Sequence, residues 1–349
     1  MRLKIVQNLS RWFQKNARVL PWRTHPDPYR VWLSEIMLQQ TQVAAVIPYF
    51  ERFLQAFPTI EDLARAPLDE VLKNWAGPGY YSRARNLHKG AKAMAERIAR
   101  NEGFPRNRAE WLEIPGVGEY TAGAVCSIAL NQPEAIVDGN VVRVLARVLA
   151  VEAADAKKTE IWAEARELVE TPACDPRTFN QALMELGALI CKPKNPKCAE
   201  CPLESQCAGK AFPERYPRPK AKVVWKHLKE EKWYLFRRNA EQEREIYLEQ
   251  NGNAGWRQGL WDFPNPSGGL ANAKLLAGFD SRYVVTTHKI VRKHTVMDLS
   301  HVPAHAWQGS GKWFSVDALP GVPAPVRKAI LQFEKNDSLA REKSSAAKI

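Results

Sequence analysis

The sequence predicts a mainly α-helical N-terminal region followed by a smaller α+β domain, and three observations lead to this fold class. Apolar residues recur at helical spacing through residues 1–207. Residues 208–222 are basic and proline-rich without such spacing, which is typical of a linker. Residues 223–335 carry short β-rich runs separated by Gly, Asn and Pro. Residues 336–349 are expected to form a flexible tail.

The individual elements follow from the same periodicity, with Pro and Gly residues between them. Helices are expected at residues 3–18, 29–38, 41–56, 60–65, 68–75, 82–99, 119–130, 140–150, 157–170 and 177–190. The clearest strand candidates are residues 233–236, 245–248 and 283–285.

Length, charge and hydropathy limit the class of protein. With 349 residues, two domains are expected. The net charge of +13, with 12 Trp and 9 Tyr, favours a polyanionic partner such as nucleic acid. No apolar run of about 18 residues occurs, and the N-terminus lacks an apolar signal-peptide core. We therefore expect a cytoplasmic protein without a membrane partner, with its thiols reduced.

Four of the six cysteines lie close together, in the spacing C-x6-C-x2-C-x5-C: Cys191, Cys198, Cys201 and Cys207. Because a reducing compartment disfavours disulfides, this spacing indicates a metal site. Structural zinc usually takes two separated pairs of ligands, whereas one compact loop of four thiolates favours a [4Fe-4S] cluster. Zinc remains the alternative. The basic loop 192–197 either contacts phosphates or is an ordinary solvated surface loop.

A tight hairpin, Ile114-Pro115-Gly116-Val117-Gly118, lies between two helical stretches. Two glycines around one apolar residue allow backbone N–H groups to point outward at a helix N-terminus, where they can bind phosphate without reading bases. A plain turn is the alternative for the motif alone. The basic charge and the cysteine loop favour a grip on a nucleic-acid backbone.

The hairpin, Asp138 beyond it and the cysteine loop together resemble the helix-hairpin-helix DNA glycosylase superfamily. Within it, the segments WLSEIMLQQTQV at 32–43 and GYYSR at 79–83 resemble the adenine DNA glycosylase (MutY-type) branch. The resemblance runs from Leu20 to Cys207. It implies a six-helix barrel, an iron-sulfur helical domain with its cluster loop at 191–207, and a Nudix-like C-terminal domain that recognises 8-oxoguanine.

The function implied by this resemblance is excision of adenine mispaired with 8-oxoguanine or guanine in double-stranded DNA. The enzyme is expected to be a monomer, associated with the nucleoid in a bacterial cytoplasm. Two alternatives stay open: a catalytically silent protein that binds damaged DNA, and an endonuclease III-like pyrimidine or mismatch glycosylase.

Two carboxyl groups supply the chemistry that base excision requires. Releasing adenine takes an acid for the base and a negative charge beside the cationic sugar. Glu35 lies among apolar neighbours in its helix, which favours a protonated carboxyl able to donate to adenine N7. Asp138 precedes a helix whose positive end favours the ionised form. The alternatives are a surface glutamate for Glu35 and a helix N-cap for Asp138, which can serve both purposes.

Tyr120 indicates which chemistry follows base removal. In the endonuclease III-like branch, a lysine at this position after the hairpin attacks the sugar and nicks the strand. A phenol cannot form the required Schiff base. We therefore expect a monofunctional glycosylase without an efficient lyase step.

The resemblance also assigns the residues that hold the flipped base and the DNA. Gln40, Thr41 and Tyr80 belong to the DNA-contacting motifs, and Gln40 and Tyr80 are expected to enter the duplex. The expected lining of the adenine pocket is Trp22, Arg23 and Gln181, although Trp22 is equally compatible with a core position. Asn140 is expected to orient the acid or the water. Pro78 stands where the family usually has leucine.

The C-terminal domain resembles the family less closely. The segment GLWDFP at 259–264 matches a family element, but residues 250–282 contain only Asp262 and Asp280 as acids, so magnesium-dependent nucleotide hydrolysis is not expected. The family's Phe-Ser-His loop should fall near Ile290-Val291-Arg292, which does not match it. Either Arg292 or His294 replaces that contact, or discrimination for 8-oxoguanine is weaker.

Overall fold

The computed structural model describes residues 1–349 apart from 77–78, 153–157, 218–223, 240, 242, 253–256, 267–272, 277, 303–308 and 347–349, and apart from the side chains of 158 and 337–346. Pro78 and the end of the predicted linker therefore lie outside the described residues. The chain forms two compact units. Met1–Arg65 with Asn86–Ala221 is called the helical unit, and Ala66–Arg85 with Lys222–Ile349 is called the sheet unit.

The boundary between the units differs from the predicted one, because residues 66–85 group with the C-terminal part of the chain. Two hydrogen bonds explain this grouping. The Tyr81 hydroxyl donates to the Val322 carbonyl at 2.9 Å, and Arg85 donates to the Gln258 carbonyl at 2.7 Å. Such long-range pairings leave no trace in local periodicity.

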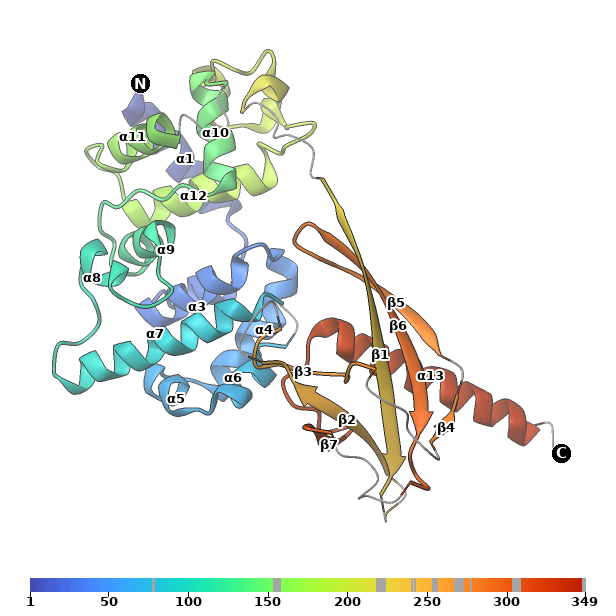
Figure 1. Cartoon of the computed structure of the whole chain (residues 1–349). Helices are drawn as coiled ribbons and strands as arrows, with labels where there is room; N and C mark the ends of the chain where they lie inside the picture. The colour runs from blue at the N-terminus through green and yellow to red at the C-terminus, as the bar shows by residue number, and fades with distance from the viewer. Residues whose placement is uncertain are drawn as a thin grey trace. The chain divides into compact units, whose positions relative to one another are not determined.

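The predicted helices are present within one or two residues of their expected ends (Figure 1). Two short helices, α2 and α8, were not predicted. The bounds are α1 Arg2–Asn16, α2 Pro21–Thr24, α3 Pro28–Leu38, α4 Val43–Ala56, α5 Ile60–Arg65, α6 Leu68–Asn74, α7 Tyr81–Ala99, α8 Arg108–Leu112, α9 Glu119–Ala124, α10 Gly139–Leu149, α11 Lys158–Val169, α12 Pro176–Leu189 and α13 Ala324–Ala346. A π-helical segment, Val125–Ala129, continues α9.

Three aspartates fix the starts of the helices that carry the candidate site. Asp27 accepts from the Arg30 amide, Asp138 from the Val141 amide and Asp175 from the Thr178 amide, so α3, α10 and α12 each have a side-chain N-cap. Behind them, a core of leucines, valines and phenylalanines joins α1, α10, α11 and α12. The site therefore rests on helix ends that are both capped and packed.

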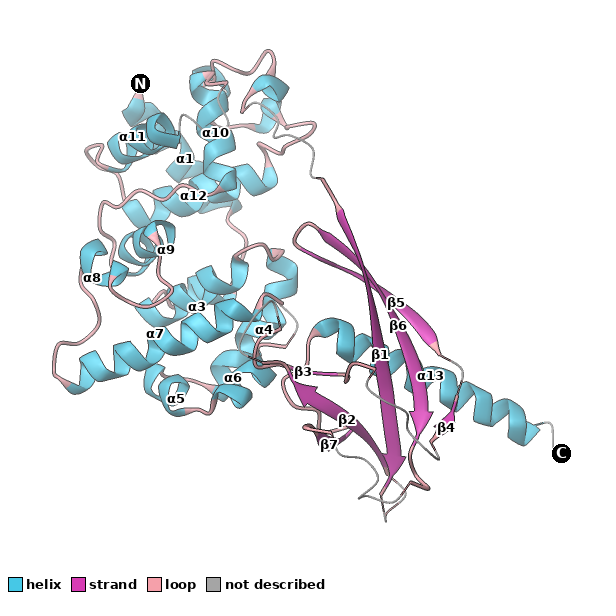
Figure 2. Ribbon diagram, viewed as in Figure 1, coloured by secondary structure: helices cyan, strands magenta, loops and turns pink. Residues whose placement is uncertain are grey.

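All the described strands lie after residue 222. Figure 2 draws them in magenta. Their bounds are β1 Lys226–Arg238, β2 Arg244–Gln250, β3 Trp261–Asp262, β4 Lys274–Leu275, β5 Phe279–Val285, β6 His288–Asp298 and β7 Lys312–Ser315. They form one mixed sheet in the order β3-β2-β1-β6-β4, in which β5 pairs with β6 and β7 with β2. β1 and β6 run parallel, and the other pairs are antiparallel.

Helix α13 packs on one face of this sheet, where its Val326, Ile330 and Phe333 join the aromatic core around Tyr234. Residues 336–349 were predicted to be a flexible tail, but α13 continues to Ala346. Its last turns contain Ala, Leu, Arg, Glu and Lys, which are strong helix formers and can extend a helix that is already anchored. None of the described helices combines the length and apolar character needed to cross a membrane.

A buried ion network lies inside the sheet unit and corrects one expectation. Arg292 is fully buried and donates to both carboxylate oxygens of Asp262, at 2.7 and 3.0 Å, and to Glu230 at 2.9 Å. His294 is equally buried. Neither side chain can therefore replace the Phe-Ser-His contact on a base at the surface. Alternation along β6 turns both residues toward the interior.

Candidate active site

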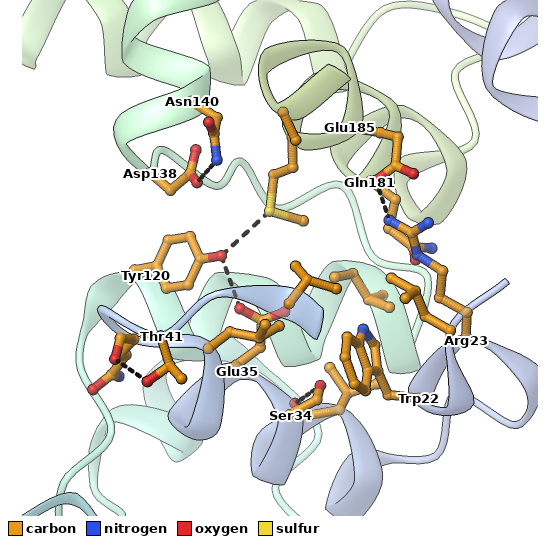
Figure 3. A pocket seen from close by; sticks show the side chains of 18 of the residues that line it. Trp22, Arg23, Ser34, Glu35, Thr41, Tyr120, Asp138, Asn140, Gln181 and Glu185 are labelled. Carbon is orange, nitrogen blue, oxygen red and sulfur yellow. Dashed lines mark hydrogen bonds and ion pairs between the residues drawn. The ribbon is translucent and has the colours of Figure 1, made fainter. Parts of the chain in front are cut away.

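Most of the predicted catalytic and pocket residues surround one cavity of about 550 Å³ in the helical unit. It is lined by side chains from α2, α3, α9 and α12 and from the segment that leads into α10 (Figure 3). The predicted residues among its lining are Trp22, Arg23, Glu35, Gln40, Thr41, Tyr120, Asp138, Asn140 and Gln181. Segments more than a hundred residues apart in the sequence therefore meet at one place.

Glu35 is the buried acid of this cavity. It lies on the buried face of α3 and is 6% exposed. Its pKa is raised to about 7, mainly by burial and also by the negative charge of Asp138, whereas the hydrogen bond from Tyr120 and the charge of Arg23 act in the opposite direction. A carboxyl group in this condition is partly protonated at neutral pH, so it can donate a proton.

Tyr120 orients Glu35. The residue lies in the first turn of α9, directly after the hairpin, and its hydroxyl donates to Glu35 Oε2 at 2.8 Å. Burial and the charges of Glu35 and Asp138 raise the pKa of the phenol well above its usual range, so the hydroxyl keeps its proton. The same oxygen lies 3.3 Å from the sulfur of Met184 on α12.

Asp138 is held by two donors at the start of α10. Its Oδ1 accepts from the Val141 amide at 2.7 Å, and its Oδ2 accepts from the Asn140 side chain at 2.8 Å. The predicted N-cap and the predicted catalytic position are thus the same residue. Asn140 was expected to orient the acid or the water. In this hydrogen bond its side chain orients Asp138 and not the acid Glu35.

Arg143 joins this end of α10 to the cysteine loop, which sequence reasoning did not predict. It donates to Asn140 Oδ1 at 2.8 Å, to the Gly187 carbonyl at 2.8 Å and to the Cys191 carbonyl at 2.7 Å. Asp138, Asn140 and Cys191, the first cysteine of the loop, therefore belong to one hydrogen-bonded chain. The only local sign of this role in the sequence was the presence of Arg143 at a helical position of α10.

The base-pocket side of the cavity contains the predicted Trp22, Arg23 and Gln181 together with an unpredicted carboxylate, Glu185. Trp22 is 7% exposed and packs edge-on against Phe50, so it is both core and lining. Gln181 is held through a hydrogen bond to the carbonyl one turn earlier in α12. These side chains offer a flat surface and polar groups to a planar ligand.

Glu185 is ion-paired with two arginines. Arg18 donates to it at 2.8 Å through each of two guanidinium nitrogens, and Arg23 donates at 3.0 Å. Burial opposes its ionisation, but these arginines outweigh burial and lower the pKa of Glu185 to about 2. Glu185 has apolar neighbours in the sequence, as Glu35 does. This pattern therefore predicted burial for both residues equally well.

The predicted hairpin has the expected backbone. Gly116 has a φ of +82°, and an added Cβ would lie 2.6 Å from the Cβ of Asn86, so only glycine fits there. Val117 is buried, whereas Gly116 and Gly118 are exposed. Gly118 is the N-cap residue of α9. Within the turn the Val117 amide donates to the Ile114 carbonyl at 3.0 Å, and the exposed Gly116 and Gly118 lie beside the helix that carries Tyr120.

The two residues predicted to enter DNA share an unusual backbone conformation. Gln40 in the helical unit has a φ of +57°, and Tyr80 in the sheet unit has a φ of +48°. Both are exposed, Tyr80 by 40%. Non-glycine residues in this region cost energy and are concentrated at functional sites. The guanidinium of Arg83 lies 5.3 Å from the centre of the Tyr80 ring and supports it.

A second cavity of about 550 Å³ lies in the sheet unit, and Tyr80 lines it. Its polar lining includes Arg85, Arg257, Ser281 and Tyr283. The Ser281 hydroxyl is 2.8 Å from Nε2 of the buried His294, and Arg257 is ion-paired with Glu230 of the buried network. Residues of the ion network and its surroundings thus hold Ser281 and Arg257 in position.

The four predicted cysteine ligands line one small cavity together with Arg147. Within the described part of the chain, no three His, Cys, Asp or Glu side chains are placed to hold a single metal ion. Four cysteine thiols around one shared space are the set of donors that a [4Fe-4S] cluster requires. Arg147 secures the loop by donating to the Lys192 carbonyl at 2.7 Å, to the Pro213 carbonyl at 2.8 Å and to Cys191 Sγ at 3.3 Å.

The chain is similar to known DNA repair proteins. The model of the HhH-GPD superfamily of base excision DNA repair proteins matches residues 33–170. The adenine DNA glycosylase of Buchnera aphidicola subsp. Acyrthosiphon pisum (strain APS) is 38% identical over 350 residues, which cover 95% of this chain and 97% of that protein. The adenine DNA glycosylase of Homo sapiens is 48% identical over 217 residues, 58% of this chain and 39% of that protein.

Among solved structures, a thermostable thymine-DNA glycosylase aligns with a TM-score of 0.55 and 31% sequence identity. The alignment covers 60% of this chain and 96% of that one.

Proposed function

Because the chain belongs to the adenine DNA glycosylase family of HhH-GPD base excision DNA repair enzymes, we propose that it excises adenine mispaired with 8-oxoguanine or guanine. DNA is its partner, and we expect it to act as a monomer at the nucleoid. One observation carries the proposal. The cavity of the helical unit holds a carboxyl whose pKa is raised to about 7, beside a second carboxylate fixed by two donors.

In the proposed reaction, Glu35 gives its proton to adenine N7, and the C1′–N9 bond breaks with its electron pair going to the base. The sugar becomes an oxocarbenium-like cation, which the Asp138 carboxylate stabilises. Water then adds to C1′, and the proton that it loses restores the Glu35 acid. Tyr120 holds Glu35 in position, and Asn140 keeps a carboxylate oxygen of Asp138 in place.

We propose that the enzyme is monofunctional. A lyase step needs an amine that attacks C1′ and forms a Schiff base. Tyr120 stands at the position in question, its phenol keeps its proton, and none of the described residues lining the cavity is a lysine. Efficient trapping of an enzyme–DNA adduct by borohydride through a lysine would contradict this assignment.

We propose that the hairpin Gly116-Val117-Gly118 binds a DNA phosphate through backbone amides and that Gln40 and Tyr80 enter the duplex. The exposed glycines and the basic charge of the chain support the first role. The strained, exposed backbones of Gln40 and Tyr80 support the second. Trp22, Arg23 and Gln181 would then line the space that receives adenine, with Thr41 at its edge.

We propose that Cys191, Cys198, Cys201 and Cys207 hold a [4Fe-4S] cluster, since their four thiols line a common space and come from one compact loop. Such a cluster would brace the loop, and no step of base excision passes through it. Iron and sulfide analysis of anaerobically purified protein, with an absorbance band near about 400 nm, tests this. Zinc without iron would overturn it.

We propose further that the sheet unit is Nudix-like and reads 8-oxoguanine at the cavity beside Tyr80. The oxidised base differs from guanine in an added carbonyl oxygen and an N7–H, which a hydroxyl such as that of Ser281 can match. The Tyr80 ring offers a stacking surface. Ser281→Ala should lower the preference for A:8-oxoguanine over A:G duplexes, and an unchanged preference would refute the assignment.

Single-turnover adenine release tests the proposed function as a whole. Duplexes with A:8-oxoguanine, A:G, A:T and T:G pairs separate adenine excision from the pyrimidine or mismatch alternative. Glu35→Gln should lower the rate by about a thousandfold or more, while Glu96→Gln, an exposed glutamate on α7, should leave it unchanged. Binding to A:8-oxoguanine without any release by the wild type would favour the silent binding protein instead.

A further inference from the structure

The cavity of the helical unit contains a methionine that the proposed mechanism does not use. Met184 on α12 lines the cavity, and its sulfur lies 3.3 Å from the Tyr120 hydroxyl oxygen (Figure 3). The same hydroxyl donates to Glu35 at 2.8 Å. A phenol has one hydrogen to donate, so the thioether and the carboxyl compete for it. At present the carboxyl wins, because sulfur is the weaker acceptor.

Apart from the N-terminal Met1, Met184 is the methionine most accessible to a small oxidant. Met37 and Met94 are fully buried, and Met297 is only 8% exposed. Met184 is half-buried and faces a cavity of about 550 Å³. Met1 is exposed, but it is the first residue and lies outside the site. Access and contact with the catalytic machinery therefore coincide at one thioether.

We propose that Met184 is a site of reversible oxidation by hydrogen peroxide or another hydroperoxide and that its sulfoxide slows base excision. The sulfur lone pair attacks one peroxide oxygen, an S–O bond forms, and the O–O bond breaks to release water. Sulfur is oxidised and the peroxide is reduced. The product adds one oxygen to the side chain and makes it polar, and sulfoxide reductases can reverse it.

The change would act through Tyr120. A sulfoxide oxygen is a strong hydrogen-bond acceptor, so it takes the Tyr120 hydrogen away from Glu35. The acid then loses the donor that holds it in position. The added oxygen also takes up room at the lining of the cavity that is proposed to receive the base. Both effects lower the rate of adenine release. This consequence rests on the proposed function, whereas the oxidation itself does not.

The test uses the intact protein with its cofactor and limited hydrogen peroxide. Peptide mass spectrometry measures the sulfoxide at each methionine, and single-turnover release from A:8-oxoguanine measures the rate before and after treatment. We expect Met184 to be oxidised well ahead of Met37, Met94 and Met297, with a rate about tenfold lower. Methionine sulfoxide reductases should restore the rate in step with the loss of sulfoxide at Met184.

Two variants separate this effect from general damage. Met184→Leu should keep its own untreated rate after peroxide, whereas Met297→Leu, a change at a buried methionine of the sheet unit, should lose rate as the wild type does. Equal loss in Met184→Leu and wild type, or a loss that follows the absorbance near about 400 nm, would overturn the proposal. So would an unoxidised Met184. Failure of the untreated wild type to release adenine would instead count against the proposed function.

Discussion

Glu35 in the helical unit and Asp262 in the sheet unit are both almost fully buried carboxyl groups, yet their surroundings are opposite. Glu35 has a neutral phenol as its hydrogen-bond donor, and burial raises its pKa to about 7. Asp262 is clasped by Arg292 through two hydrogen bonds. Its neighbour Glu230 has its pKa lowered to about 2, because the arginines outweigh burial.

The difference shows that the counter-ion, and not burial, decides what a buried carboxyl does. Within the catalytic cavity itself, Glu185 behaves like the sheet network, since Arg18 and Arg23 hold it ionised. Glu35 differs from Glu185 because its donor is a neutral phenol, and its raised pKa makes it the group able to donate a proton. The ion-paired Glu185 instead holds Arg18 and Arg23 in place near Glu35.

The largest effect is expected at Asp138, the second carboxylate of the proposed mechanism. Asp138→Asn keeps an oxygen for the Val141 amide, so the N-cap and the fold should be retained. The negative charge beside the sugar is lost, and adenine release should fall about a hundredfold to a thousandfold. Single-turnover kinetics and thermal unfolding measure the two properties separately. A rate within tenfold of the wild type would show that Asp138 is only a cap.

In the sheet unit, removal of one partner should cost stability rather than chemistry. Arg292→Met leaves the buried Asp262 and the half-buried Glu230 without their main counter-ion and should destabilise the fold by about 3–5 kcal/mol. Arg282→Met, an exposed arginine on the neighbouring strand β5, should change stability by less than about 0.5 kcal/mol. Urea unfolding measures both. Equal losses in the two variants would mean that the buried network is not what holds the unit together.

The two regions should also respond to pH with opposite signs. The pKa of Glu35 rises from 4.5 to about 7 on folding, so its burial costs nothing below pH 4.5 and costs most above pH 7. The pKa of Glu230 falls from 4.5 to about 2, so the stability from its ion pairs is present above pH 4.5 and is lost as the pH falls toward 2. The pKa of His294 falls from 6.5 to about 4, so its burial costs nothing above pH 6.5 and lowers stability as the pH falls toward 4. Adenine release should accordingly decline as the pH rises above about 7.

Comparison of Glu35→Gln with the wild type isolates the contribution of Glu35 to the pH dependence of stability. The variant should unfold at a higher temperature than the wild type at pH 8, by an amount that corresponds to a few kcal/mol, and at nearly the same temperature at pH 5. A stabilisation of equal size at both pH values would mean that Glu35 is not a carboxyl with a raised pKa.

The sequence predicted this site unevenly, for physical reasons. Helical periodicity located α3 and α10, and apolar flanks pointed to Glu35, because both signals are local. The same flanks surround Glu185, but its meaning depends on Arg18, far away in the sequence. The grouping of residues 66–85 with the sheet unit likewise depends on distant partners. Local pattern therefore found the groups that are buried, and tertiary pairing decided which of them remain chemically active.

The smallest effect tests how tightly Asp138 must be held. Gly187 of α12 lies against the start of α10, and an added Cβ there would be 2.6 Å from the Cβ of Asn140. Gly187→Ala must therefore displace Asn140, which holds Asp138 and is itself held by Arg143. A displacement of this size should lower adenine release by about tenfold, because catalytic groups are sensitive to shifts of less than 1 Å.

Gly252→Ala, where an added Cβ meets nothing, is the matched control and should leave the rate unchanged. If Gly187→Ala is as active as this control, Asp138 is positioned by its helix cap alone, and the chain from Asn140 through Arg143 to Cys191 is structural support without influence on the reaction. If only Gly187→Ala slows adenine release, the hydrogen bonds that position Asp138 matter for the rate. They are then as important for Asp138 as the lack of an arginine partner is for Glu35.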